Sequence, residues 1–76
     1  MKTSRAQLVA LADRLKWAVG PRAAKWKLDY DAVNGGWLIV NEVPGGGEER
    51  PLGHRRRSAA CMADVLEFAV LAVGKV

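Results

Sequence analysis

Three consecutive arginines, Arg55, Arg56 and Arg57, stand directly before Ser58, a residue type that is common at helix N-caps. Exposed cations at a helix N-terminus oppose the macrodipole by roughly 0.3–1 kcal/mol each, so stability alone would not choose them there. Free helix amides and guanidinium groups together form a site for an anion, such as a phosphate or a partner's carboxylate. The cluster therefore predicts a contact with an acidic protein or with nucleic acid. The alternative is a solvated basic loop that pairs with the acids of the preceding hairpin.

Two nearby residues, Arg50 and His54, share whichever role the arginine cluster has. A third candidate is Trp17, because tryptophan is a preferred anchor at interfaces. On a helix it lies off the leucine stripe and beside Lys16, so it is either covered by the hairpin or exposed as a contact. The predicted partner- or anion-binding residues are Arg50, His54, Arg55, Arg56, Arg57 and Trp17.

The other residues with chemical potential favour structural roles. His54 and Cys61 supply at most half of a zinc site, and no further Cys or His completes it. A nucleophilic Cys–His pair is the alternative, but the apolar neighbours of Cys61 favour a small core residue. Residues 45–47 are glycines followed by two acids instead of the Lys-Ser or Lys-Thr of a phosphate loop. Asp29 and Asp31 suit the wet face of a strand. We therefore expect no enzyme activity, catalytic residue, metal or cofactor.

A helix over residues 4–19 is predicted to precede the candidate site. Ser4 and Gln7 fit a capping box, and apolar residues then recur at helical spacing. Gly20-Pro21 supplies a stop. Residues 21–25 form a short connection with room for one helical turn.

Period-two alternation then predicts a β-hairpin with one buried face. Its strands span about residues 25–31 and 37–43, and Asn34-Gly35-Gly36 forms the turn. The second strand is apolar on both faces, which indicates a central strand. Pro44 and the glycines after it end this strand. Residues 49–54 form either a third edge strand or a loop.

The last helix is predicted to follow Ser58 and to run to about residue 73. Asp64 and Glu67 are its only charged residues, and its apolar residues extend well beyond one face. A helix that is apolar most of the way round is normally buried on two sides. We therefore expect a homodimer that forms through this C-terminal helix.

Length, charge and cysteine content set the remaining limits. Seventy-six residues make one domain with a small core, which buries only about 60% of the unfolded surface. One cysteine excludes an internal disulfide and suits a reducing compartment. Charged residues interrupt the first twenty positions, and no apolar run approaches the roughly 20 residues of a membrane span. We expect a cytoplasmic protein that does not enter a membrane.

The net charge of +4 is unevenly distributed. Residues 1–27 carry seven bases and one acid, residues 28–49 five acids and no base, and residues 50–57 four arginines. A basic balance attracts acidic partners or nucleic acid, but the acidic hairpin works against a uniformly basic face. The leading hypothesis is a non-enzymatic module that binds a protein. The alternative is a nucleic-acid-binding protein that adds Lys2, Arg5, Arg14 and Lys16 to the arginine cluster.

The predicted fold is α+β: a helix, an antiparallel meander of two or three strands, and a second helix, with both helices packed on one sheet face. The expected core consists of Leu8, Leu11, Leu15, Trp26, Leu28, Tyr30, Ile39, Met62, Val65, Leu66 and Ala69.

Residues 26–71 also resemble small proteins of unknown function encoded in bacteriophage and prophage genomes. The matching stretches are Leu28-Asp29-Tyr30, Gly35-Gly36-Trp37-Leu38, Gly45-Gly46-Gly47 and Arg56-Arg57-Ser58-Ala59. In that group an aromatic residue usually precedes the paired glycines, whereas this chain has Asn34. The resemblance implies a phage accessory protein that acts by binding a host or phage component, and it supplies no catalytic residues.

Overall fold

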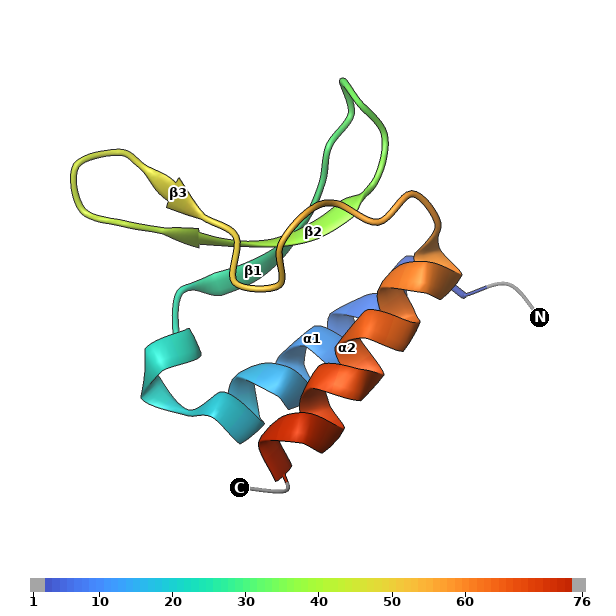
Figure 1. Ribbon diagram of the computed structural model, residues 1–76, viewed down its shortest axis with the longest axis horizontal. Coiled ribbons are helices and arrows are strands. Elements are labelled where there is room, and N and C mark those ends of the chain that lie inside the picture. Colours follow the sequence, from blue (N-terminus) through green and yellow to red (C-terminus); the bar gives the residue numbers. More distant parts are fainter. Residues whose placement is uncertain (1–2, 75–76) are drawn as a thin grey trace.

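A computed structural model of the chain describes residues 3–74. Figure 1 shows the two long helices side by side against one face of a small sheet, running in the same direction. Their N-termini therefore lie at the same end of the molecule. The predicted α+β order of helix, meander and helix is confirmed. The elements in chain order are α1 (Arg5–Val19), a 3-10 turn η1 (Pro21–Ala23), β1 (Trp26–Tyr30), β2 (Trp37–Glu42), β3 (Glu48–Glu49) and α2 (Ala59–Gly74).

The helix α1 begins directly after the predicted cap Ser4 and ends at Val19, as the sequence predicted. The backbone N–H of Gln7 donates to Ser4 Oγ at 3.2 Å, and the Ser4 N–H donates to Gln7 Oε1 at 2.7 Å. This capping box satisfies amides that have no partner within the helix. Gly20 ends α1 with a φ of 92°, which an L side chain rarely adopts. The predicted helical turn in the connection is η1.

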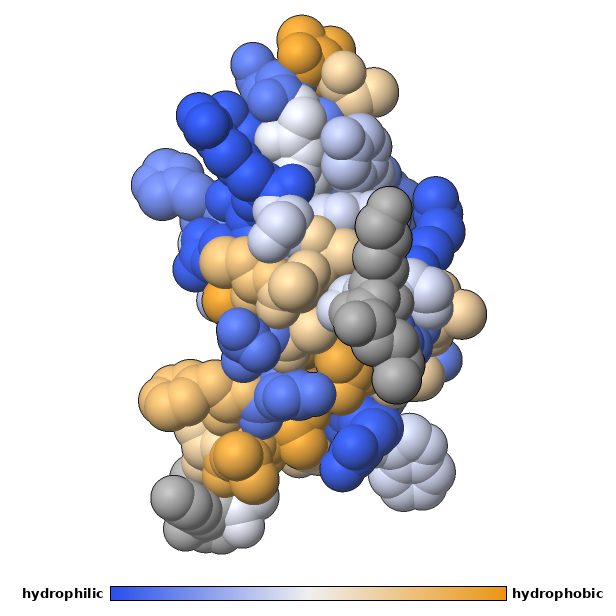
Figure 2. Space-filling model, turned by 90° about the vertical axis from the view of Figure 1, so that its right-hand side faces the viewer, coloured by the Kyte–Doolittle hydropathy of each residue, from blue (hydrophilic) through white to orange (hydrophobic). Residues whose placement is uncertain are grey.

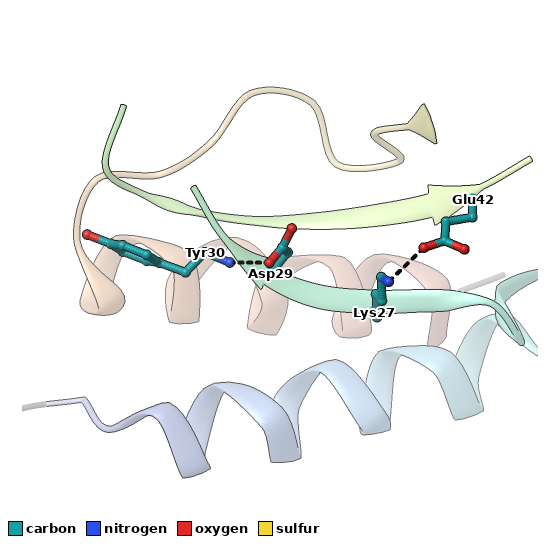
Figure 3. A network of polar contacts seen from close by, with 4 residues as sticks. All are labelled: Lys27, Asp29, Tyr30 and Glu42. Atoms are coloured by element: carbon teal, nitrogen blue, oxygen red, sulfur yellow. Dashed lines mark hydrogen bonds and ion pairs between the residues drawn. The ribbon is translucent and has the colours of Figure 1, made fainter. Parts of the chain in front are cut away.

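The strands form one antiparallel sheet in the order β1-β2-β3, so β2 is central as predicted. Residues 38–40 are all buried, because both faces of β2 are covered. On the β1–β2 pair, Lys27 Nζ and Glu42 Oε1 form an exposed ion pair at 2.7 Å (Figure 3). The third strand is only Glu48–Glu49 and pairs with Asn41 and Glu42. Most of the segment 49–54, for which a strand or a loop was expected, is loop.

The core lies between the helices and the sheet, and it is built from Leu8, Ala12, Leu15, Ile39, Met62 and Leu66. Of the predicted core, five residues are buried and four are half-buried against them: Leu8, Leu15, Ile39, Met62 and Leu66, and then Leu11, Trp26, Leu28 and Ala69. Val65 is half-buried and lies outside this cluster. The prediction for Tyr30 is wrong, since its side chain is 45% exposed. Its ring extends past the end of the edge strand β1 (Figure 3) and packs edge-on against Trp37, with 4.9 Å between ring centroids. Cys61 was expected in the core and is exposed, because its helical position lies about 100° from that of Met62.

Within residues 3–74, neither helix combines the length and the apolar character needed to cross a membrane.

Candidate partner-binding site

The backbone of the arginine cluster is held against the start of β2. The Arg56 N–H donates to Trp37 O, and the Trp37 N–H donates to Arg56 O, both at 2.7 Å. This pair of bonds is an isolated antiparallel bridge. It fixes the approach of the chain to α2, two residues before Ser58. The cluster is therefore an ordered part of the fold and not a free loop.

The three arginines have different roles. Arg55 is half-buried, and its Nε donates to Gly35 O at 2.9 Å, which ties the cluster to the β1–β2 turn. Arg56 is also half-buried as a residue, and its guanidinium donates to the carbonyl of His54. Arg57 is exposed. Arg57 is thus the member of the cluster with the most freedom to contact a partner.

The N-termini of both helices add to this site. Ser58 caps α2, as predicted, by accepting the Cys61 N–H at 3.0 Å. Neither helix has an acidic residue in its first turn, so nothing there offsets the positive ends of the two dipoles. The Arg5 guanidinium carbon lies 5.9 Å from the centroid of the Trp37 ring, beside the bridge to Arg56. We call the surface formed by Arg5, His54, Arg55, Arg56 and Arg57 the basic end.

Two predicted site residues lie elsewhere. Trp17 is 88% exposed in the last turn of α1, about 18 Å along the helix from Arg5 at 1.5 Å per residue. Arg50 follows β3 near Asn41, whereas Arg56 pairs with Trp37, roughly 13 Å away along β2 at 3.3 Å per residue. Sequence reasoning placed Arg5 only in the nucleic-acid alternative. The sequence feature that could have identified Arg5 is its position next to the N-cap Ser4, since Arg57 is likewise next to the N-cap Ser58.

Arg14 and Lys16, the basic residues farther along α1, do not form one surface with the arginine cluster. Arg14 lines a groove between α1 and α2, and Lys16 lines a different groove between α1 and β1. Of the four bases in the nucleic-acid alternative, Arg5 reaches the basic end, and Lys2 lies outside the described residues.

The turn that receives Arg55 is built around Asp31. One carboxylate oxygen, Oδ1, accepts the N–H groups of Val33 and Asn34, both at 3.0 Å, and the Asp31 carbonyl accepts the Gly35 N–H at 2.7 Å. These bonds aim the Gly35 carbonyl at Arg55. Hydrogen bonds from Asn34 are the largest reason that the pKa of Asp31 lies below its ordinary 3.8, and the charge of Arg55 adds a smaller lowering.

A lowered carboxyl pKa links this turn to acid stability. Folding gains from ionised Asp31 above pH 3.8, and the gain is lost as the pH falls through the lowered pKa. We expect Asp31→Asn to be less stable than the wild type at pH 6, with the gap closing at lower pH. Denaturant unfolding across that range measures it. Asp13→Asn, which changes an exposed carboxylate on α1, is the control. A gap that stays constant down to about pH 2 would contradict the prediction.

Within residues 3–74, no group of three or more His, Cys, Asp or Glu residues is placed to hold a metal ion. Cys61 is exposed as a free thiol at the start of α2.

No protein-family model, curated protein or solved structure matches this chain.

Proposed function

We propose that this protein is a non-enzymatic binding module whose basic end contacts an acidic surface of a protein partner. The observation that carries the proposal is the meeting of two helix N-termini and four arginines without an acid in either first turn. Helix dipoles and guanidinium groups both favour carboxylates, and arginine binds them in a bidentate geometry. The resemblance to phage accessory proteins supports the same kind of role.

The charge distribution favours a protein over nucleic acid. A nucleic-acid duplex is a long polyanion and needs an extended basic track. Here Arg14 and Lys16 line separate grooves away from the basic end. The sheet and its turns, residues 26–49, carry five acids and one base, Lys27, which pairs with Glu42, and this excess of acids would repel such a polyanion. A compact acidic patch on a protein can engage the basic end without meeting the sheet.

The proposal also includes self-association and a cytoplasmic location. Phe68 and Leu71 on α2 are 74% and 64% exposed, as expected of a helix that a second copy of the chain covers. A free, exposed cysteine is suited to a reducing compartment. We propose a cytoplasmic homodimer that forms through α2.

Charge reversal at the basic end should separate binding from stability. Arg5→Glu with Arg57→Glu places acids at the starts of both helices, where each is favourable by about 0.3–1 kcal/mol. Losing the Arg5–Trp37 contact costs a similar amount. We therefore expect an unchanged melting temperature and at least tenfold less partner captured from nuclease-treated lysate, since like charges at an interface cost several kcal/mol.

The matched control is Arg22→Glu with Lys25→Glu, which makes the same charge change at the opposite end of the molecule. This variant should capture the partner as the wild type does. Equal capture by both double variants would refute the proposal. Recovery of nucleic acid alone, lost after nuclease treatment, would replace it with the nucleic-acid alternative.

A further inference from the structure

The helix pair has an outer face that the sheet does not cover. Trp17 lies nine residues after the buried Leu8, and Leu71 lies nine residues after the buried Met62. Nine residues at 100° each amount to half a turn, so both side chains point away from the core. They are 88% and 64% exposed. Figure 2, seen from the end of the molecule where both helices begin, shows hydrophobic side chains gathered over the helical part, with hydrophilic ones among them.

A groove of about 210 Å³ crosses this face between the helices. Leu11 from α1 and Val70 from α2 line it, together with Leu71, and its two charged residues are Arg14 from α1 and Glu67 from α2. Within residues 3–74 neither charge has an ion-pair partner. A patch with an apolar centre, a cation on one helix and an anion on the other is complementary to itself.

We propose that two copies of the chain pack through this outer face about a two-fold axis parallel to the helices. In that arrangement α1 of each copy lies on α2 of the other. Because α1 and α2 run in the same direction (Figure 1), positions at equal depth in the two helices face each other. Trp17 and Leu71 are each twelve residues from the start of their helix, and Arg14 and Glu67 are nine and eight residues from it. Trp17 therefore packs on Leu71 of the second copy, and Arg14 pairs with its Glu67.

The charges select this axis over the perpendicular one. A two-fold axis across the helices would lay α1 on α1 and α2 on α2 in opposite directions. Arg14 would then face Arg14, and Glu67 would lie near Glu67 and Asp64 of the second copy. Like charges brought together at an interface cost several kcal/mol, whereas the parallel axis pairs opposite charges twice.

The size of the face indicates a reversible dimer. The sixteen residues of α2 extend about 24 Å, and two packed helices are about 20 Å wide, which gives roughly 500 Å² for each copy. The total of about 1,000 Å² lies at the low end of specific interfaces. This inference deepens the self-association in the proposed function, and it is independent of what the basic end binds.

A charge exchange tests the axis directly. Arg14→Glu and Glu67→Arg each turn both interface pairs into like charges, so each should raise the dimer Kd at least about tenfold. Combining the two changes in one chain should restore dimerisation. An equimolar mixture of the two single variants should form mixed dimers, because both pairs are then opposite again. If Arg14 and Glu67 acted only within one chain, mixing the two single variants would not produce mixed dimers. Sedimentation velocity measures all four samples.

A second comparison tests the apolar contact. Trp17→Glu should dissociate the dimer, whereas Val33→Glu, at an equally exposed apolar residue in the β1–β2 turn, should not. Three results would each overturn the inference. They are a wild type that is monomeric at about 0.5 mM, single charge variants that associate as the wild type does, and a mixture of these variants that forms no mixed dimers. The two proposals are separable, because monomeric Arg14→Glu should still capture the partner. Intact dimers that capture the partner equally well with and without Arg5→Glu and Arg57→Glu would refute only the role of the basic end.

Discussion

Replacing Leu66 by alanine should lower the free energy of unfolding by about 2–5 kcal/mol. Leu66 is fully buried, and it packs in the cluster that joins α2 to α1 and to Ile39 of β2. Removing its branched end deletes buried methyl groups and leaves a cavity between both helices and the sheet. A domain of this size has a total stability of roughly 4–11 kcal/mol at 0.05–0.15 kcal/mol per residue. The single substitution therefore removes a large part of the stability, which urea unfolding followed by tryptophan fluorescence measures.

Leu71→Ala is the matched control for this prediction. It makes the same chemical change on the same helix, but at a side chain that is 64% exposed. In dilute solution, below the concentration of self-association, it should cost less than about 1 kcal/mol. Equal losses for the two variants would mean that the contact between α2 and the core does not limit stability.

Replacing Gly36 by alanine should damage the fold and the basic end together. Gly36 has a φ of +136°, and an added Cβ would lie 3.0 Å from the Arg56 carbonyl oxygen and 3.1 Å from the Arg55 side chain. The Trp37–Arg56 bridge lies next to this contact, so it must shift or break. We expect a loss of about 1–3 kcal/mol in unfolding free energy, the cost of a strained backbone position. We also expect weaker partner capture, because the arginines lose their anchor.

Gly46→Ala separates backbone strain from the clash. Gly46 also has a positive φ, +89°, but an added Cβ there would meet nothing within 4 Å. It lies in the β2–β3 turn, away from the basic end. Its variant should lose some stability and keep full capture of the partner. If Gly36→Ala captured the partner equally well, the bridge would not be what positions the arginines.

Local and periodic signals made much of the architecture predictable. The capping box at Ser4, the glycine stop at Gly20 and the cap at Ser58 each depend on residues within a few positions of one another. The apolar run of β2 indicated a strand with both faces buried, because any side chain on either face of a central strand meets other residues.

The composition of the candidate site was less predictable, because it depends on contacts between distant segments. The packing of α1 against the sheet places Arg5 beside Trp37, 32 positions later in the chain. The Trp37–Arg56 bridge joins residues 19 positions apart, and no short-range pattern encodes it. Arg55 resembled a free cation in the sequence, yet it donates to the Gly35 carbonyl.

The linear pattern of residues was sufficient for the types and approximate bounds of both helices, β1 and β2, and for the basic cluster before α2, because the interactions behind them are local. It left open whether residues 49–54 form a strand, and β3 is only Glu48–Glu49. The packing of the chain determined which of these cations share a surface, that Tyr30 and Cys61 are exposed, and that Arg14 and Glu67 line one groove. The shared surface and the shared groove depend on the relative direction and depth of α1 and α2, which the burial of their apolar side chains against a common sheet establishes.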